Sequence, residues 1–245
     1  MTNELFNKEE LNKFTNIYKN LVGDDEFEIM FGGYTKTNSI NMKQFLDILK
    51  YLKIFADEKK YKIIHTETLD ISYNYDSKNF HTYRISIDGV DKINSLMAML
   101  HKRENHIIFS ILSSKLLSSD NEGLSIINKK KDFDNTYNLD KHNIRVRLAK
   151  EEKVSNSKLG ELIKLDNVSK IAIMLRMKSR ISVVIENNSE VDLRIDLTSV
   201  KQCNDINKLQ KITPNYELEI DFNKKKKLSV AKEKEYLDKI LYYIT

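Results

Sequence analysis

The sequence lacks the features that mark several classes of protein. Its 245 residues include one cysteine, Cys203, one proline, Pro214, six glycines and no tryptophan. A single cysteine excludes an internal disulfide framework and fits a reducing compartment. So few glycines and prolines exclude collagenous and linker-like sequence. No apolar run reaches membrane-spanning length, and residues 1–8 lack the basic and apolar regions of a signal peptide. We therefore expect a soluble, intracellular globular protein with no membrane partner.

Common catalytic motifs are also missing. The chain contains no Gly-rich phosphate loop, no Gly-x-Ser-x-Gly segment and no cysteine-centred nucleophile. Its five histidines show no metal-ligand spacing. Any phosphate binding would therefore use side chains. The formal net charge of +5 permits an anionic partner without requiring one.

The apolar pattern predicts one domain over residues 1–245, mainly β with flanking helices (α+β). A first helix begins at Asn7, which with Glu10 forms a capping pair, and a second covers 41–55. Further helices are expected at 93–101 and 229–243, whereas 106–117 fits either a strand or a helix. Strands are expected at 26–31, 68–75, 80–87, 124–132, 143–151, 171–186 and 191–201 and after Pro214, and turn-forming residues 76–79 connect the second and third of these strands.

The most informative segment is the last strand, where acidic residues alternate with apolar ones. Glu217, Glu219 and Asp221 would share one face of that strand, and Glu26 and Glu28 repeat the pattern near the start of the chain. Like charges about 4 Å apart repel by roughly 4 kcal/mol at an effective dielectric constant near 20. If a curled or closed sheet brings the two strands together, a divalent metal is the simplest counter-ion.

Basic residues alternate with apolar residues in the strands between these acidic segments. A solvated sheet face also alternates, so one such strand is uninformative. Here at least six strands alternate, and their polar members are mostly charged. This regularity favours a closed barrel with its charged faces inward, because guanidinium and ammonium groups suit phosphate oxygens. The inward residues of these strands would be Arg84, one or two lysines of 129–131, Arg145, Arg147, Glu151, Arg176, Lys178, Arg180, Arg194, Asp196 and Thr198.

The order of these motifs resembles that of the triphosphate tunnel metalloenzymes. Glu-x-Glu, Arg-x-Ser, Arg-x-Lys-x-Arg-x-Ser, Arg-x-Asp-x-Thr and Glu-x-Glu-x-Asp follow one another over residues 26–222. The likeness is greatest to the metal-dependent RNA triphosphatase domains of mRNA capping enzymes from large DNA viruses and fungi. It implies an eight-stranded antiparallel β-barrel with helices packed outside. It leaves open whether the chain is complete or the N-terminal domain of a longer capping enzyme, and a viral member would act in the host cytoplasm or the virion.

The resemblance also implies roles for individual residues. Glu151 would orient the attacking water. Divalent Mn²⁺ or Mg²⁺ would be held by Glu26, Glu28, Glu217 and Glu219, with Asp221 nearby. The catalytic basic residues would be Arg84, Lys178 and Arg180, and the other substrate-binding residues Lys129, Lys131, Arg145, Arg147, Arg176, Arg194, Asp196 and Thr198, the last of which would hydrogen-bond within its strand.

The first functional hypothesis is an RNA 5′-triphosphatase. It would remove the γ-phosphate of nascent mRNA and leave a diphosphate end for guanylyl transfer, beside guanylyltransferase and methyltransferase domains or subunits. A second reading is hydrolysis of free tripolyphosphate or nucleoside triphosphates. A third is a non-catalytic barrel that binds RNA ends or a capping partner. The Glu-x-Glu pairs favour an enzyme, since a mere anion binder gains nothing from clustered carboxylates.

Overall fold

The computed structural model describes residues 6–21, 25–32, 40–74, 81–103, 105–117, 124–163 and 172–244. Within these ranges eight strands, each antiparallel to its neighbours, close into a barrel in the order β1-β5-β4-β3-β2-β6-β7-β8. The strands are β1 (Glu26–Phe31), β2 (Lys62–Asn74), β3 (His81–Asp88), β4 (Leu124–Leu139), β5 (Ile144–Lys153), β6 (Ala172–Asn187), β7 (Val191–Cys203) and β8 (Asn215–Lys224).

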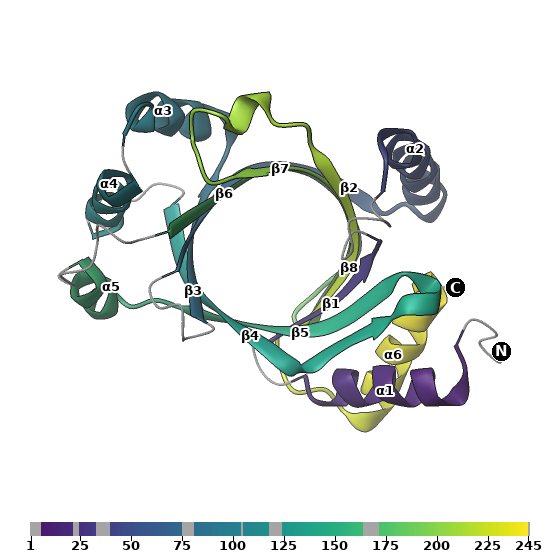
Figure 1. The fold of residues 1–245 in the computed structure, drawn as a ribbon. Coiled ribbons are helices and arrows are strands. Elements are labelled where there is room, and N and C mark those ends of the chain that lie inside the picture. The colour runs from purple at the N-terminus through teal and green to yellow at the C-terminus, as the bar shows by residue number, and fades with distance from the viewer. Residues whose placement is uncertain are drawn as a thin grey trace.

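Helices surround the barrel on its outer side, as the view along the barrel axis shows (Figure 1). Helices α3, α4 and α5 lie on one side of the ring, α2 lies opposite, and α1 and α6 lie together below β1 and β5. In the described part of the chain, no helix is long and apolar enough to cross a membrane. The bounds are α1 (Lys8–Lys19), α2 (Met42–Lys59), α3 (Val90–Leu100), α4 (Asn105–Leu117), α5 (Asn156–Ile163) and α6 (Val230–Ile244).

Most elements match the sequence-based expectation, and the differences have local causes. The Asn7 side chain caps α1 and forms a capping box with Glu10, and the ambiguous segment 106–117 is helical in α4. Strand β2 starts at Lys62 instead of residue 68, because pairing with β6 extends it. Strand β4 continues to Leu139 through an irregular register after Lys131. Helix α5 was not predicted, and the expected turn at 76–79 lies outside the described residues.

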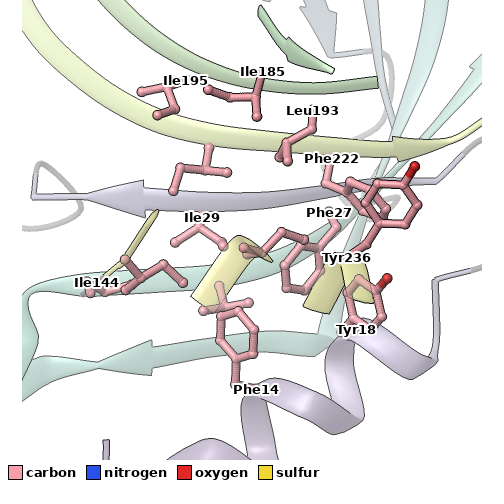
Figure 2. Packing of buried hydrophobic residues seen from close by; sticks show 14 of the residues in the cluster. Phe14, Tyr18, Phe27, Ile29, Ile144, Ile185, Leu193, Ile195, Phe222 and Tyr236 are labelled. Carbon is pink, nitrogen blue, oxygen red and sulfur yellow. The ribbon is translucent and has the colours of Figure 1, made fainter. Parts of the chain in front are cut away.

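The hydrophobic core lies between the barrel and the helices. One cluster joins α1, α2 and α6 to β1, β5, β7 and β8, and a second joins α3 and α4 to β2 and β3. In the first cluster Phe27 of β1 packs edge-on against Phe14 and Tyr18 of α1, with ring centroids 5.4 and 5.5 Å apart. On β8, the ring centroid of Phe222 lies 5.5 Å from that of Tyr236 of α6 (Figure 2).

This outer core determines which residues point inward. In β1, Phe27 and Ile29 are fully buried in the outer cluster. Successive strand residues face opposite sides of a sheet, so Glu28 between them points into the barrel. Residues also alternate between the two faces in β6. Leu175 packs in the hydrophobic cluster that includes α3 and α4, and the next residue, Arg176, faces the barrel interior. The charged faces predicted from the alternation therefore line the barrel interior, called the lumen below.

We predict that the outward-facing side chains of β1 contribute strongly to the free energy of unfolding. Replacing Phe27 by alanine removes a fully buried ring and should lower the free energy of unfolding by about 3–5 kcal/mol. Urea denaturation of the whole chain measures this change. The control is Tyr51→Ala on α2, because Tyr51 is 66% exposed and its truncation should change the free energy by only about 0.5 kcal/mol. Equal effects from the two substitutions would contradict an outward-facing Phe27.

Candidate active site in the barrel lumen

A chain of ion pairs in the lumen joins β1, β3, β4 and β5. Glu151 of β5 accepts hydrogen bonds from Arg84 Nη2 at 2.8 Å and from Lys129 Nζ at 3.0 Å. Lys129 Nζ also lies 3.4 Å from Glu28 Oε1, and Arg147 donates its Nε–H to the other oxygen of Glu28. The sequence predicted all five residues as site residues. The fold brings them together from four strands.

Asp70 is a lumen acid that the sequence reasoning missed. Asp70 of β2 is 2% exposed and accepts a hydrogen bond from Ser86 Oγ at 2.7 Å. Its carboxylate lies 2.5 Å from Lys178 Nζ and 3.9 Å from Arg84 Nε. Asp70 thus joins Lys178 and Arg84, two of the basic residues that are expected to contact phosphate. The available signal was its place between Leu69 and Ile71, the same alternation that was used for the other strands.

Acids of β7 and β8 meet the basic strand β6. Arg180 Nη1 lies 2.9 Å from Asp196 Oδ2. Its Nη1 and Nη2 also lie 4.0 Å from carboxylate oxygens of Asp221 and Glu219 respectively. Arg176 Nη2 donates to both oxygens of Glu217, at 2.7 and 2.9 Å. The basic strand β6 and the acidic strand β8, which flank β7 in the barrel wall, therefore meet on the inner face of the barrel.

Neighbouring acids in the lumen titrate very differently. Burial opposes ionisation of Glu28, but the charges of Lys129 and Arg147 outweigh it and lower its pKa to about 2. Burial and the charges of Glu28 and Glu217 raise the pKa of Glu219 to about 7. Burial and Glu151 raise the pKa of Glu26 to about 7 as well. Burial and Glu219 raise the pKa of Asp221 above its usual range. We call the paired strands β1 and β8, with Glu26, Glu28, Glu219 and Asp221, the β1–β8 seam. The negative charge of these carboxylates exceeds the positive charge that the neighbouring basic residues supply.

The donor set suits a hard divalent cation in its chemistry, since carboxylate oxygens are the ligands such ions prefer. Asp221 Oδ1 is buried with no hydrogen-bond partner among the described residues. Nevertheless, no group of three or more acidic, histidine or cysteine side chains in the described ranges is arranged around a common point. Basic side chains stand among the acids instead, as the contacts of Glu28 and Glu219 show.

The strand register limits which predicted ligands can share one ion. Glu28 pairs with Asp221 across the β1–β8 seam, and Met30 pairs with Glu219. Glu26 pairs with Asn223, six residues from Glu217, which is about 20 Å along an extended strand. A single ion cannot take ligands from both Glu26 and Glu217, so the expected four-glutamate set is too large for one site. Within the set of four glutamates, Glu28 and Glu219 lie between Glu26 and Glu217 along the paired strands.

Four predicted substrate-binding residues have other surroundings. Arg145 Nε donates to Asn138 Oδ1 at 2.9 Å, and Arg194 Nε donates to Asp192 Oδ1 at 2.9 Å. The Thr198 hydroxyl is buried with no hydrogen-bond partner among the described residues, so the expected bond within its strand is not formed. The Lys131 side chain lies outside the described residues, although its backbone pairs with Ala149.

One end of the barrel opens into a cavity of about 780 Å³. Glu26 and Glu151 line its inner side, and Lys150 and Lys153 of β5 line it together with Lys225. The buried Nε atoms of Arg84 and Arg176 have no hydrogen-bond partner among the described residues, so both can still donate to an anion. Donor groups without a hydrogen-bond partner among the described residues therefore lie in the lumen, and the cavity meets the lumen at Glu26 and Glu151.

Comparisons with known proteins support the barrel fold. The sequence is 28% identical over 219 residues to the probable mRNA-capping enzyme of Acanthamoeba polyphaga mimivirus; the alignment covers 89% of this chain and only 17% of that enzyme. The crystal structure of the RNA triphosphatase domain of a trifunctional mimivirus mRNA capping enzyme superposes with a TM-score of 0.70 at 25% identity. That superposition covers 98% of this chain and 97% of the other.

A monoclinic structure of the mimivirus capping enzyme triphosphatase has a TM-score of 0.68 at 24% identity over 98% of this chain and 99% of the other, and it shows the shared fold. No protein-family model matches the chain. The chain is therefore similar in sequence and in structure to the RNA triphosphatase domain of the mimivirus mRNA capping enzyme, and its barrel has the triphosphate tunnel fold.

Proposed function

We propose that the chain is a metal-dependent RNA 5′-triphosphatase that removes the γ-phosphate of nascent mRNA. The observation that carries this proposal is Glu151, a lumen carboxylate held by Arg84 and Lys129 beside the acids of the β1–β8 seam. The likeness to a capping-enzyme triphosphatase domain supports it. The matched relative is a much longer protein, so we further propose that this domain acts with a guanylyltransferase and a methyltransferase, as parts of one chain or as subunits.

The metal site would be centred on Glu28 and Glu219, with Glu26 or Asp221 completing it. These side chains supply hard oxygen donors from the two strands that pair at the seam. A bound Mn²⁺ or Mg²⁺ would supply Lewis acidity and neutralise charge on the γ-phosphate. Glu217 is engaged by Arg176 and would act outside this set.

The protein's own side chains would position the reactants. Arg84 and Lys129 fix the Glu151 carboxylate, which would accept a hydrogen bond from the attacking water and orient it. Lys178 and Arg180 would stabilise the negative charge that moves toward the leaving oxygen. Asp70 would hold Lys178 and Arg84 in place, because its carboxylate contacts both.

Hydrolysis of free tripolyphosphate or nucleoside triphosphates is a second candidate. The described lumen contacts involve charged groups that suit phosphates, and none of them reads a base or a sugar. Release of γ-phosphate from triphosphate-ended RNA, compared with release from tripolyphosphate and ATP, tests both candidates. Activity should disappear when a chelator removes divalent metal. An RNA-binding barrel without catalysis would release no phosphate from any substrate.

We predict that Glu28, Glu219 and Glu217 contribute unequally to phosphate release. Glu28→Gln and Glu219→Gln should each lower phosphate release by at least about a hundredfold, because a hard ion loses an anionic ligand. Glu217→Gln should lower it much less, since Glu217 pairs with Arg176. Circular dichroism would confirm folding, which matters most for Glu28→Gln because it leaves Arg147 without its carboxylate. A loss in Glu217→Gln as large as in Glu219→Gln would refute this ligand set.

A second prediction separates Glu151 from the metal ligands. Glu151→Gln should lower kcat strongly and leave the half-saturating Mn²⁺ concentration nearly unchanged, as expected for a group that acts mainly in the transition state. The matched control is Glu152→Gln, which changes the next residue on β5 and therefore the opposite face of the strand. A shifted metal requirement in Glu151→Gln would move Glu151 into the ligand set, and equal mild effects would remove it from the site.

A further inference from the structure

Arg147 occupies the centre of the acidic seam in the structure. It is the direct cross-strand partner of Glu28 in the β1–β5 pairing and donates its Nε–H to that carboxylate. The Glu28 side chain is only 9% exposed, so little water competes for its oxygens. The charges of Glu219 and Asp221 also act on the Arg147 guanidinium. A positive group therefore already stands among the carboxylates to which a metal would bind.

A divalent ion and this guanidinium cannot both stay beside Glu28 without strong repulsion. Like charges at a few ångströms repel strongly where solvent screening is weak, and the arginine remains protonated under all ordinary conditions. Lys129 can keep its contact with Glu151 when it leaves Glu28, since it binds both carboxylates. Arg147 has Glu28 as its hydrogen-bonded acid, so metal binding would release the Arg147 guanidinium into the lumen.

A released guanidinium would find its natural partner in the triphosphate. Its planar fork matches two oxygens of a phosphate group, and the lumen is where the phosphates would lie. We propose that Arg147 is an internal counter-ion of the metal site, displaced from Glu28 when the metal binds and then transferred to the substrate phosphates. This inference rests on the proposed function. It makes metal binding and triphosphate binding mutually favourable, because each removes an obstacle to the other.

The neighbouring arginines provide contrasts. Arg145 lies two residues earlier on the same face of β5, where its direct cross-strand partner on β1 is Met30, and it donates its Nε–H to Asn138. Arg180 approaches Glu219 and Asp221 only to 4.0 Å and has Asp196 at 2.9 Å, so it keeps a carboxylate partner when a metal enters. Arg147 thus differs from both, because its direct cross-strand partner is Glu28, a proposed metal ligand.

Direct Mn²⁺ binding tests the proposal without any catalytic readout. Free Mn²⁺ is measured by electron paramagnetic resonance during titration of the full chain and of its Arg147→Gln and Arg145→Gln variants, without phosphate. Arg147→Gln should bind Mn²⁺ roughly tenfold more tightly than the wild type, because one competing positive charge is gone. Arg145→Gln should match the wild type. Equal or weaker Mn²⁺ binding by folded Arg147→Gln would overturn the proposal.

The coupling is measured with imidotriphosphate, a non-hydrolysable triphosphate. It should tighten Mn²⁺ binding in the wild type and in Arg147→Lys, which keeps the positive charge, by a larger factor than in Arg147→Gln. Equal tightening in all three proteins would overturn the transfer to phosphate.

A measurement on the wild type covers the case in which Arg147→Gln does not fold. The Arg147 Nε–H resonance, assigned by its loss in Arg147→Lys, should shift when Mg²⁺ is added, because its hydrogen bond to Glu28 is broken. An unchanged resonance at saturating Mg²⁺ would overturn the proposal. If Mn²⁺ binding behaves as expected but no γ-phosphate is released, the proposed function fails and the competition at Glu28 stands. If phosphate is released but Arg147→Gln leaves Mn²⁺ affinity unchanged, only this inference fails.

Discussion

Charge neutralisation inside a closed barrel is the constraint on which the rest of the structure depends. Helices cover the outer face of the strands and form the hydrophobic core there, so the inner face is left to charged side chains. A buried ion without a partner is destabilising by several kcal/mol. Acids in the interior therefore meet bases, several of them from another strand, as Glu151 meets Arg84 and Asp196 meets Arg180. The charge of an inward residue on one strand therefore depends on the inward residues of the strands around it.

The balance is incomplete where β1 and β8 pair. Burial and neighbouring carboxylates raise the pKa values of Glu26, Glu219 and Asp221, while Glu28 stays ionised because Arg147 and Lys129 reach it. Such a region is destabilising for the fold unless protons or added cations reduce the repulsion. The same imbalance makes it a suitable place for a divalent metal, so the region of the lumen with raised carboxylate pKa values is also the proposed metal site.

The barrel is preserved at low sequence identity to the mimivirus triphosphatase domain, with a TM-score of 0.70 at 25% identity. Cores tolerate many apolar substitutions as long as volume and pattern are kept, and here the pattern has a period of two outside the register shifts of β4 and β6. Many outward residues need only to be apolar, as Phe27 and Ile29 are, and many inward residues need only the right charge. Few individual identities are required, so the fold is much better preserved than the sequence.

The sequence by itself determined the local pattern: which residues of a strand share a face, the capping box at Asn7 and the position of most strands. These features depend on neighbours a few residues away, and the alternation of Glu26, Glu28, Glu217 and Glu219 is visible without a structure. Only the tertiary structure decided the register, which separates Glu26 from Glu217, places Arg147 on Glu28 and brings Asp70 to Lys178. The register depends on how strands that are distant in the sequence pair when the barrel closes. The alternation within one strand shows which residues share a face, but it does not show which residue of the neighbouring strand lies opposite each of them.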